Sequence, residues 1–206
     1  MLPLLAAAVL CAADHTGASA APDPLGRGAW FLDPSEDAVR LVTPRAGVET
    51  FRGCRWPSQL VVDSSGTAYV TCRQSGEVQR LVSGQPPTIW AVGAEPSALA
   101  LDEAAGRLYV GLATSAAVVM LDAVSGRALA RAEVGTEPTA VALFAGGLAV
   151  AARKRDVLQI HPRSLDAPPL ERRLYVPRLD PEVAVSVGAE VLVPESSRLI
   201  IVAPVA

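Results

Sequence analysis

The chain is poor in several residue types on which many binding and catalytic sites depend. Its 206 residues include no asparagine, one lysine (Lys154), two histidines and three cysteines, and aromatic residues make up only 4%. No C-x-x-C-H haem motif occurs, and no pair of cysteines has metal-ligand spacing. The formal net charge of -3 removes the positive field that non-specific nucleic-acid binding needs. We therefore expect no metal, no cofactor and no nucleic-acid partner.

The N-terminal residues have the pattern of an export signal. Residues 2–13 form an apolar run that is too short to span a bilayer, and Ala18-Ser19-Ala20 has the small-x-small form of a signal peptidase site. The sequence therefore predicts a signal peptide over residues 1–20 and a periplasmic or secreted mature chain without an integral membrane span. A buried N-terminal segment and a lipid anchor at Cys11 stay open as alternatives.

Export leaves two cysteines in the predicted mature chain, Cys54 and Cys72. Because oxidising compartments let disulfides persist, we expect one bridge between them. Two buried thiols are the alternative.

The most informative pattern is an internal repeat. Prolines 57, 96, 138 and 181 each precede an alternating apolar run, at intervals of 39, 42 and 43 residues. After each proline we expect four short strands, as in residues 98–101, 108–110 and 117–121 and in a fourth strand that follows Ser125-Gly126 and ends at Val134-Gly135. Four antiparallel strands per period of about 40 residues are typical of a β-propeller blade. The sequence therefore predicts an all-β fold over residues 21–206, with blades beginning near these prolines. A β-sandwich is the competing fold, but it predicts no such repeat.

Residues 90–143 carry a more specific resemblance. The segment "VGAEPSALALDEAAGRLYVGLATSAAVVMLDAVSGRALARAEVGTEPTAVAL" has a V-G-x-x-P corner, a D-x-x-x-G-x-x-L-Y-V hairpin and a closing V-x-x-x-D-x-x-x-G. It resembles the YVTN family of propeller repeats, a WD40-like architecture with surface-layer-like and lactonase-like members. The family's usual asparagine after the Tyr-Val strand is replaced by Gly111 and Thr71.

The resemblance implies a ring of about seven blades, whereas this sequence has material for about four to five. We therefore expect an open or incomplete ring. Two explanations of the low blade number stay open. The reading frame is truncated, or the protein forms a small five-bladed ring.

In propellers, the loops between blades and those between the second and third strands converge on one face. The residues expected there are Arg55, Trp56, Arg73, Glu95, Glu137, Arg153 and Arg155. A tryptophan face beside a guanidinium can hold an anion or an aromatic partner, so Arg55, Trp56 and Arg73 are the first candidates. The alternatives are a surface ion-pair network and solvated loops.

Catalysis is not evident in this pattern. Acid-base or nucleophilic work needs a His, Cys or carboxylate with a partner in reach, and His161 lies away from the expected face. We therefore expect a binding or scaffold module that contacts a protein, a glycan or a cell-envelope component. The alternative is the N-terminal part of a larger propeller enzyme, either lactonase-like or joined to a c-type di-haem peroxidase domain.

Overall fold

The computed structural model describes residues 14–152, 157–173, 185–187, 190–195 and 198–202. This part of the chain contains the strands β1 to β20 and one short 3-10 turn, η1 (Pro34–Glu36). No helix within the described residues is long and apolar enough to cross a membrane.

The strands pair in chain order into successive antiparallel sheets. The first sheet contains β2 (Ala20–Pro22), β3 (Ala29–Asp33), β4 (Ala38–Thr43) and β5 (Gly47–Arg52). The second contains β6 (Pro57–Val62), β7 (Ala68–Cys72), β8 (Glu77–Leu81) and β9 (Thr88–Ala91). The third contains β10 (Pro96–Asp102), β11 (Arg107–Leu112), β12 (Ala117–Asp122) and β13 (Ala128–Glu133). The fourth contains β14 (Pro138–Phe144), β15 (Gly147–Ala152), β16 (Val157–His161) and β17 (Leu170–Arg173).

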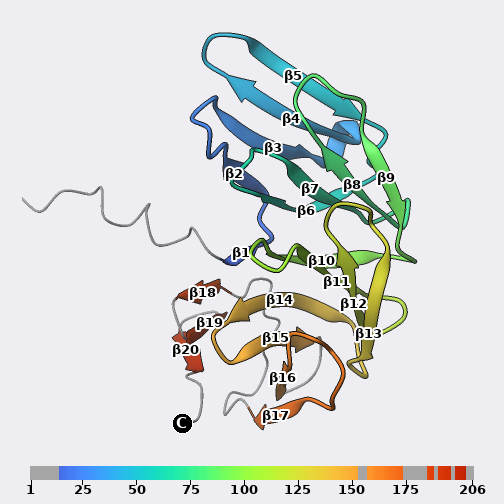
Figure 1. The fold of residues 1–206 in the computed structure, drawn as a ribbon, viewed down its shortest axis with the longest axis vertical. Helices are drawn as coiled ribbons and strands as arrows, with labels where there is room; N and C mark the ends of the chain where they lie inside the picture. The colour runs from blue at the N-terminus through green and yellow to red at the C-terminus, as the bar shows by residue number, and fades with distance from the viewer. Residues whose placement is uncertain (1–13, 153–156, 174–184, 188–189, 196–197, 203–206) are drawn as a thin grey trace, which may run out of the picture.

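A further sheet contains β18 (Val185–Val187), β19 (Glu190–Glu195) and β20 (Arg198–Val202). The sheets follow one another around an arc, with the first strand of each sheet toward its centre (Figure 1). The first strands of the second, third and fourth sheets begin at Pro57, Pro96 and Pro138. The predicted all-β fold with four-stranded antiparallel blades is therefore confirmed, and these sheets are called blades below.

Several of the hairpin turns begin with an aspartate. In the second blade Asp63 Oδ1 accepts hydrogen bonds from the backbone N–H of Ser65 and Thr67, each at 2.9 Å. Gly66 then takes a φ of +79°, which a residue without a Cβ adopts without strain. The hairpin from Asp122 to Gly126 has the same arrangement. Hydrogen bonds from the Ser125 hydroxyl and from the Ser125 backbone N–H to the Asp122 carboxylate lower the pKa of Asp122.

Blades stack because their strands are apolar on both faces. Along β10, Leu99 and Leu101 pack against residues of the second blade, whereas Ala98 and Ala100 pack against the fourth. Successive side chains of a strand point to opposite faces, so a run of four apolar residues joins three consecutive blades. Small residues face one neighbour and large residues the other. A single blade would leave both of these faces in water, so burial of the core requires the stack.

The N-terminal segment differs from the sequence expectation. β2 completes a four-stranded first blade by pairing Ala21 with Trp30. β1 (Asp14–Thr16) lies at the centre of the arc, paired with β10 (Figure 1). Residues 14–20 of the predicted signal peptide thus lie against the blades, and residues 1–13 lie outside the described residues.

Candidate functional site

The connections between blades form corners with a repeated backbone geometry. Trp56 and Glu95, which precede the prolines of β6 and β10, both have a φ of +54°. The carbonyl oxygen of Trp56 accepts a hydrogen bond from Arg73 N at 3.0 Å, and that of Glu95 accepts one from Ala113 N at 2.9 Å. Each corner is therefore fixed to the loop that follows the second strand of its own blade.

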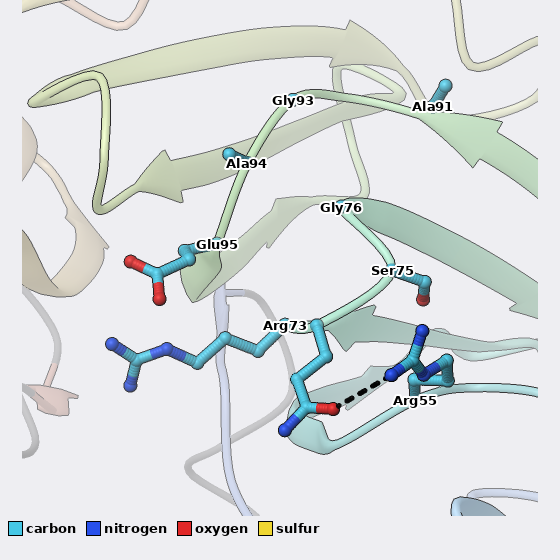
Figure 2. A pocket seen from close by; sticks show the side chains of 9 residues that line it. Arg55, Arg73, Ser75, Gly76, Ala91, Gly93, Ala94 and Glu95 are labelled. Carbon is cyan, nitrogen blue, oxygen red and sulfur yellow. Dashed lines mark hydrogen bonds between the residues drawn. The ribbon is translucent and has the colours of Figure 1, made fainter.

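We call the surface formed by these loops the corner face. It consists of residues 55–56, 73–76, 93–95, 113–116 and 136–137. An open pocket of about 660 Å³ lies on it between the second and third blades. Figure 2 shows that the corner before β6, the loop after β7 and the corner before β10 all contribute to it. Its lining residues are Arg55, Arg73, Gln74, Ser75, Gly76, Ala91, Gly93, Ala94 and Glu95.

The charged groups of the corner face are paired unequally. Arg73 Nη2 lies 3.3 Å from Glu137 Oε1, so this ion pair joins the second blade to the corner that begins the fourth. Glu95 Oε2 accepts a hydrogen bond from the Thr114 hydroxyl at 3.0 Å. The Arg55 guanidinium has a 3.5 Å contact with Gln74 Oε1, and no carboxylate of the described residues lies within ion-pair distance of it. Arg55 is therefore the cation of this face that is most available to a ligand.

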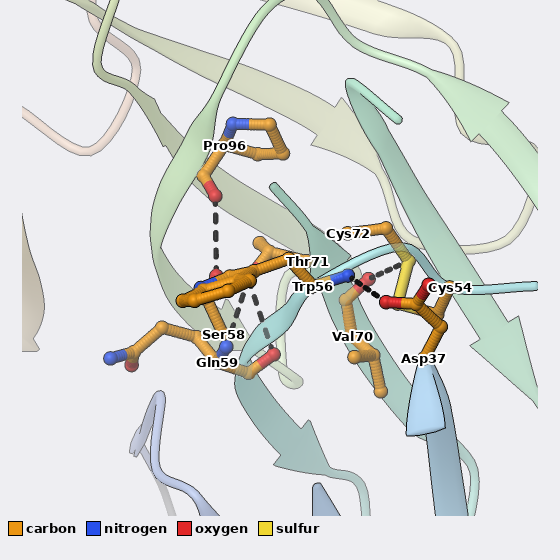
Figure 3. Close-up of a disulfide and its surroundings, with 9 residues drawn as sticks. All are labelled: Asp37, Cys54, Trp56, Ser58, Gln59, Val70, Thr71, Cys72 and Pro96. Carbon is orange, nitrogen blue, oxygen red and sulfur yellow. Dashed lines mark hydrogen bonds between the residues drawn. A yellow bond between two sulfur atoms is a disulfide. The ribbon is translucent and has the colours of Figure 1, made fainter. Parts of the chain in front are cut away.

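Trp56 stands at the edge of this region with half of its surface exposed. Its backbone N–H donates to Asp37 Oδ1 at 2.8 Å, which fixes the corner to the end of η1 in the first blade. Close to it, Cys54 and Cys72 form a disulfide with a Cα–Cα separation of 4.9 Å (Figure 3). Both cysteines are fully buried. The bridge connects the corner that carries Arg55 and Trp56 covalently to the end of β7.

The structure brings together most of the residues expected on this face. Arg55, Arg73 and Glu95 line one pocket, and Glu137 is joined to it through Arg73. Trp56 follows Arg55 in the chain but is not among the lining residues. Arg153 and Arg155 lie outside the described residues. Within the described residues no group of three or more His, Cys, Asp or Glu side chains has the arrangement of a metal site.

Sequence reasoning missed a set of hydroxyl groups that join the corners. Ser58 Oγ donates to the carbonyl oxygen of Pro96 at 3.3 Å, and Ser97 Oγ donates to that of Pro138 at 2.6 Å. Each bond connects the start of one inner strand to the start of the next. The available signal was a hydroxyl residue directly after each of these corner prolines, which recurs with the period of the blades.

The two departures from the usual asparagine have different structural reasons. A Cβ on Gly111 would lie 3.0 Å from Ala98 Cβ and 3.2 Å from Pro138 Cβ, so the next blade fills the space of a side chain. Thr71 keeps a polar atom, because its Oγ1 accepts from Gln59 N at 3.0 Å. Neither position therefore offers an amide group to a ligand.

His161 ends β16, away from the residues that line the pocket, and it is 1% exposed. Burial lowers the pKa of its imidazole below 6.5. The folded chain therefore favours the neutral ring. The contribution of His161 to the free energy of unfolding is complete above pH 6.5. It decreases as the pH falls below this value, because the unfolded chain then takes up a proton more readily than the folded chain.

We expect His161→Gln to remove this part of the acid dependence. Urea unfolding at pH 7.5 and below pH 6 measures it, and the limiting slope for one group is about 1.4 kcal/mol per pH unit. Equal acid dependence in the variant and the wild-type chain would contradict the assignment to His161.

The chain is similar to known proteins in its fold, but its sequence matches no known family. No family model and no curated relative matches the chain. Virginiamycin B lyase from Staphylococcus aureus superposes with a TM-score of 0.70 at 11% identity, over 85% of this chain and 66% of that one. A chain of the mitotic checkpoint complex gives a TM-score of 0.70 at 14% identity, over 85% and 58%. A candidate 6-phosphogluconolactonase from Bacteroides fragilis gives 0.62 at 17% identity, over 82% and 57%.

The chain has a β-propeller fold. It spans less than two thirds of the length of these three propeller chains. Because they include enzymes and a component of a protein complex, and because their identity to this chain is low, the similarity establishes the fold and no activity.

Proposed function

We propose that the protein is an exported propeller of the YVTN type that binds an acidic protein or cell-envelope partner through the corner face, without catalysis. The observation that carries the proposal is the position of Arg55, whose guanidinium lines an open pocket and has no carboxylate partner among the described residues. A guanidinium recognises carboxylates through two parallel hydrogen bonds. The next residue in the chain, Trp56, has half of its surface exposed.

Two further features support an exported binding module. The Cys54–Cys72 bridge is typical of proteins that work in oxidising compartments. The pocket is held by covalent and hydrogen-bonded corners, and a preorganised site loses less conformational entropy when a partner binds.

Glu95 sets the expected selectivity. Its carboxylate lines the same pocket as Arg55 and Arg73, so it repels an acidic ligand and reduces the net positive charge of the site. The pocket therefore favours ligands whose acidic groups lie on the side of Arg55.

A direct test measures the binding of fluorescein-labelled poly-L-glutamate to the full chain by fluorescence anisotropy. We expect Arg55→Gln to weaken binding about tenfold, which corresponds to about 1.4 kcal/mol of a charge-assisted hydrogen bond. Glu95→Gln is expected to tighten binding. Arg45→Gln, on an exposed hairpin of the first blade, is the matched control and should leave binding unchanged. All affinities should decrease with added salt.

Equal affinities for the wild-type chain, Arg55→Gln and Arg45→Gln would show that the acidic polymer senses only net charge, and would reject the corner face. Tighter binding of poly-L-lysine than of poly-L-glutamate would reject an acidic partner.

The alternative is that the chain is part of a larger propeller enzyme. It is favoured by the similarity to a lyase and a candidate lactonase, of which the chain spans 66% and 57%. The nucleotide sequence beyond codon 206 separates the two functions. Three further YVTN units followed by a C-x-x-C-H motif would exclude a stand-alone binding module.

A further inference from the structure

The innermost strands of the second and third blades have a backbone edge that their own blades do not use. Within its blade, β6 pairs only with β7, and β10 pairs only with β11. The other edge of each strand faces the centre of the arc, where the first strands of the blades lie together (Figure 1). An unpaired strand edge is a template for another extended segment, because its N–H and C=O groups need partners.

In this structure residues 14–18 supply those partners. β1 pairs antiparallel with residues 100–102 of β10, and Gly17 N donates to Leu99 O at 2.7 Å. Ala18 then exchanges two hydrogen bonds with Leu60 of β6, at 2.9 and 2.8 Å. One short segment thus pairs with the inner edges of two consecutive blades.

The space around Gly17 favours a residue without a side chain. A Cβ on Gly17 would overlap Gln59 Oε1 and would lie 3.0 Å from the Leu99 carbonyl oxygen. Relief of the contact with Leu99 O requires the backbone of β10 to shift by a few tenths of an ångström, whereas the Gln59 amide is the end of a flexible side chain. Ser19 behaves differently, because its side chain is exposed and only its carbonyl oxygen is used, as acceptor for Leu32 N.

We propose that the inner edges of β6 and β10 form a strand-binding groove for an extended partner segment with glycine at the position of Gly17 and a small residue after it. Residues 14–18 of the chain occupy this groove as an intramolecular strand. They make the main-chain hydrogen bonds by which extended peptides add to sheet edges, and steric exclusion at Gly17 supplies the selectivity. Cleavage after Ala20, which the sequence predicts, detaches this segment and opens the groove to the partner.

The groove is distinct from the corner-face pocket. It uses backbone groups of β6 and β10 and side-chain exclusion by Gln59, whereas the pocket uses Arg55, Arg73 and Glu95. The failure of one proposal leaves the other standing.

The first experiment uses the full chain and a fluorescein-labelled peptide of sequence DHTGASA, which copies residues 14–20. Gly17→Val in the protein is expected to expel the intramolecular strand, so that the peptide binds this variant at least about tenfold more tightly than it binds the wild-type chain. Ser19→Val adds the same side chain at an exposed position and should behave as the wild type. The peptide DHTVASA should not bind.

If the Gly17→Val chain is folded by circular dichroism and does not bind the peptide, or binds DHTVASA equally well, the groove is rejected. A second measurement needs no variant. In the wild-type chain the amide hydrogens of Gly17 and Ala18 should exchange slowly, and excess unlabelled DHTGASA should accelerate their exchange by displacing them. Fast exchange without the peptide, or protection that the peptide does not alter, overturns the proposal.

Discussion

Replacing Trp30 by alanine is expected to lower the free energy of unfolding by roughly 3–5 kcal/mol. Trp30 is fully buried between the first and second blades, and its ring lies 5.4 Å from that of Phe51. It packs in one cluster with Leu60, Val70 and the disulfide. Removal of the indole leaves a cavity at this blade interface. The surrounding strands are close-packed, so they cannot move far enough to fill it.

Trp30→Phe is the matched control. The indole Nε1 has no hydrogen-bond partner among the described residues, so phenylalanine removes a buried unsatisfied donor as well as part of the ring. We expect a much smaller loss than for alanine. Urea unfolding followed by circular dichroism measures both. If Trp30→Ala cost less than about 1 kcal/mol, the first blade would not pack on the second as the structure shows.

Loss of the Cys54–Cys72 bridge is expected to cost about 3 kcal/mol, the loop-entropy value for cysteines some 18 residues apart. The double variant Cys54→Ala/Cys72→Ala and the reduced wild-type chain should therefore unfold at similar, lower urea concentrations than the oxidised wild type. The loss should also increase the mobility of the Arg55–Trp56 corner, because the bridge connects this corner to β7.

The control for this prediction is the reductant itself. Adding it to the double variant should change nothing, which separates loss of the bridge from any general effect of the reagent. If a thiol-blocking reagent modified Cys54 and Cys72 in the unfolded, unreduced wild-type chain, the bridge would be absent and the prediction would be wrong.

The blade repeat could be predicted because local pattern and packing agree. Residues 98–101 are apolar without interruption, and the stack uses both faces of that strand. The first blade was predicted less well. β2 has the sequence Ala-Ala-Pro, which carries little strand propensity, and it forms because the edge of β3 offers it hydrogen-bond partners.

The candidate site was predictable in position and less so in detail. The corner prolines place Arg55, Arg73 and Glu95 on one face because the connections before β6 and β10 share the same backbone geometry. The ion pair between Arg73 and Glu137 joins residues 64 positions apart, and it depends on the rotation between blades, which no local pattern encodes. The intramolecular strand was concealed because its residues also have the composition of a signal-peptide cleavage region.

The central claim is that binding occurs at the corner face of the stacked blades. It is tested most directly by mapping the backbone amide chemical shifts of the full chain, labelled with nitrogen-15, as poly-L-glutamate is added. We predict that the shifts that change are confined to residues 55–56, 73–76, 93–95, 113–116 and 136–137, and that Arg55→Gln strongly reduces these changes. Changes centred on the outer hairpins, such as residues 44–47 and 124–127, or changes that Arg55→Gln leaves intact, would contradict the account.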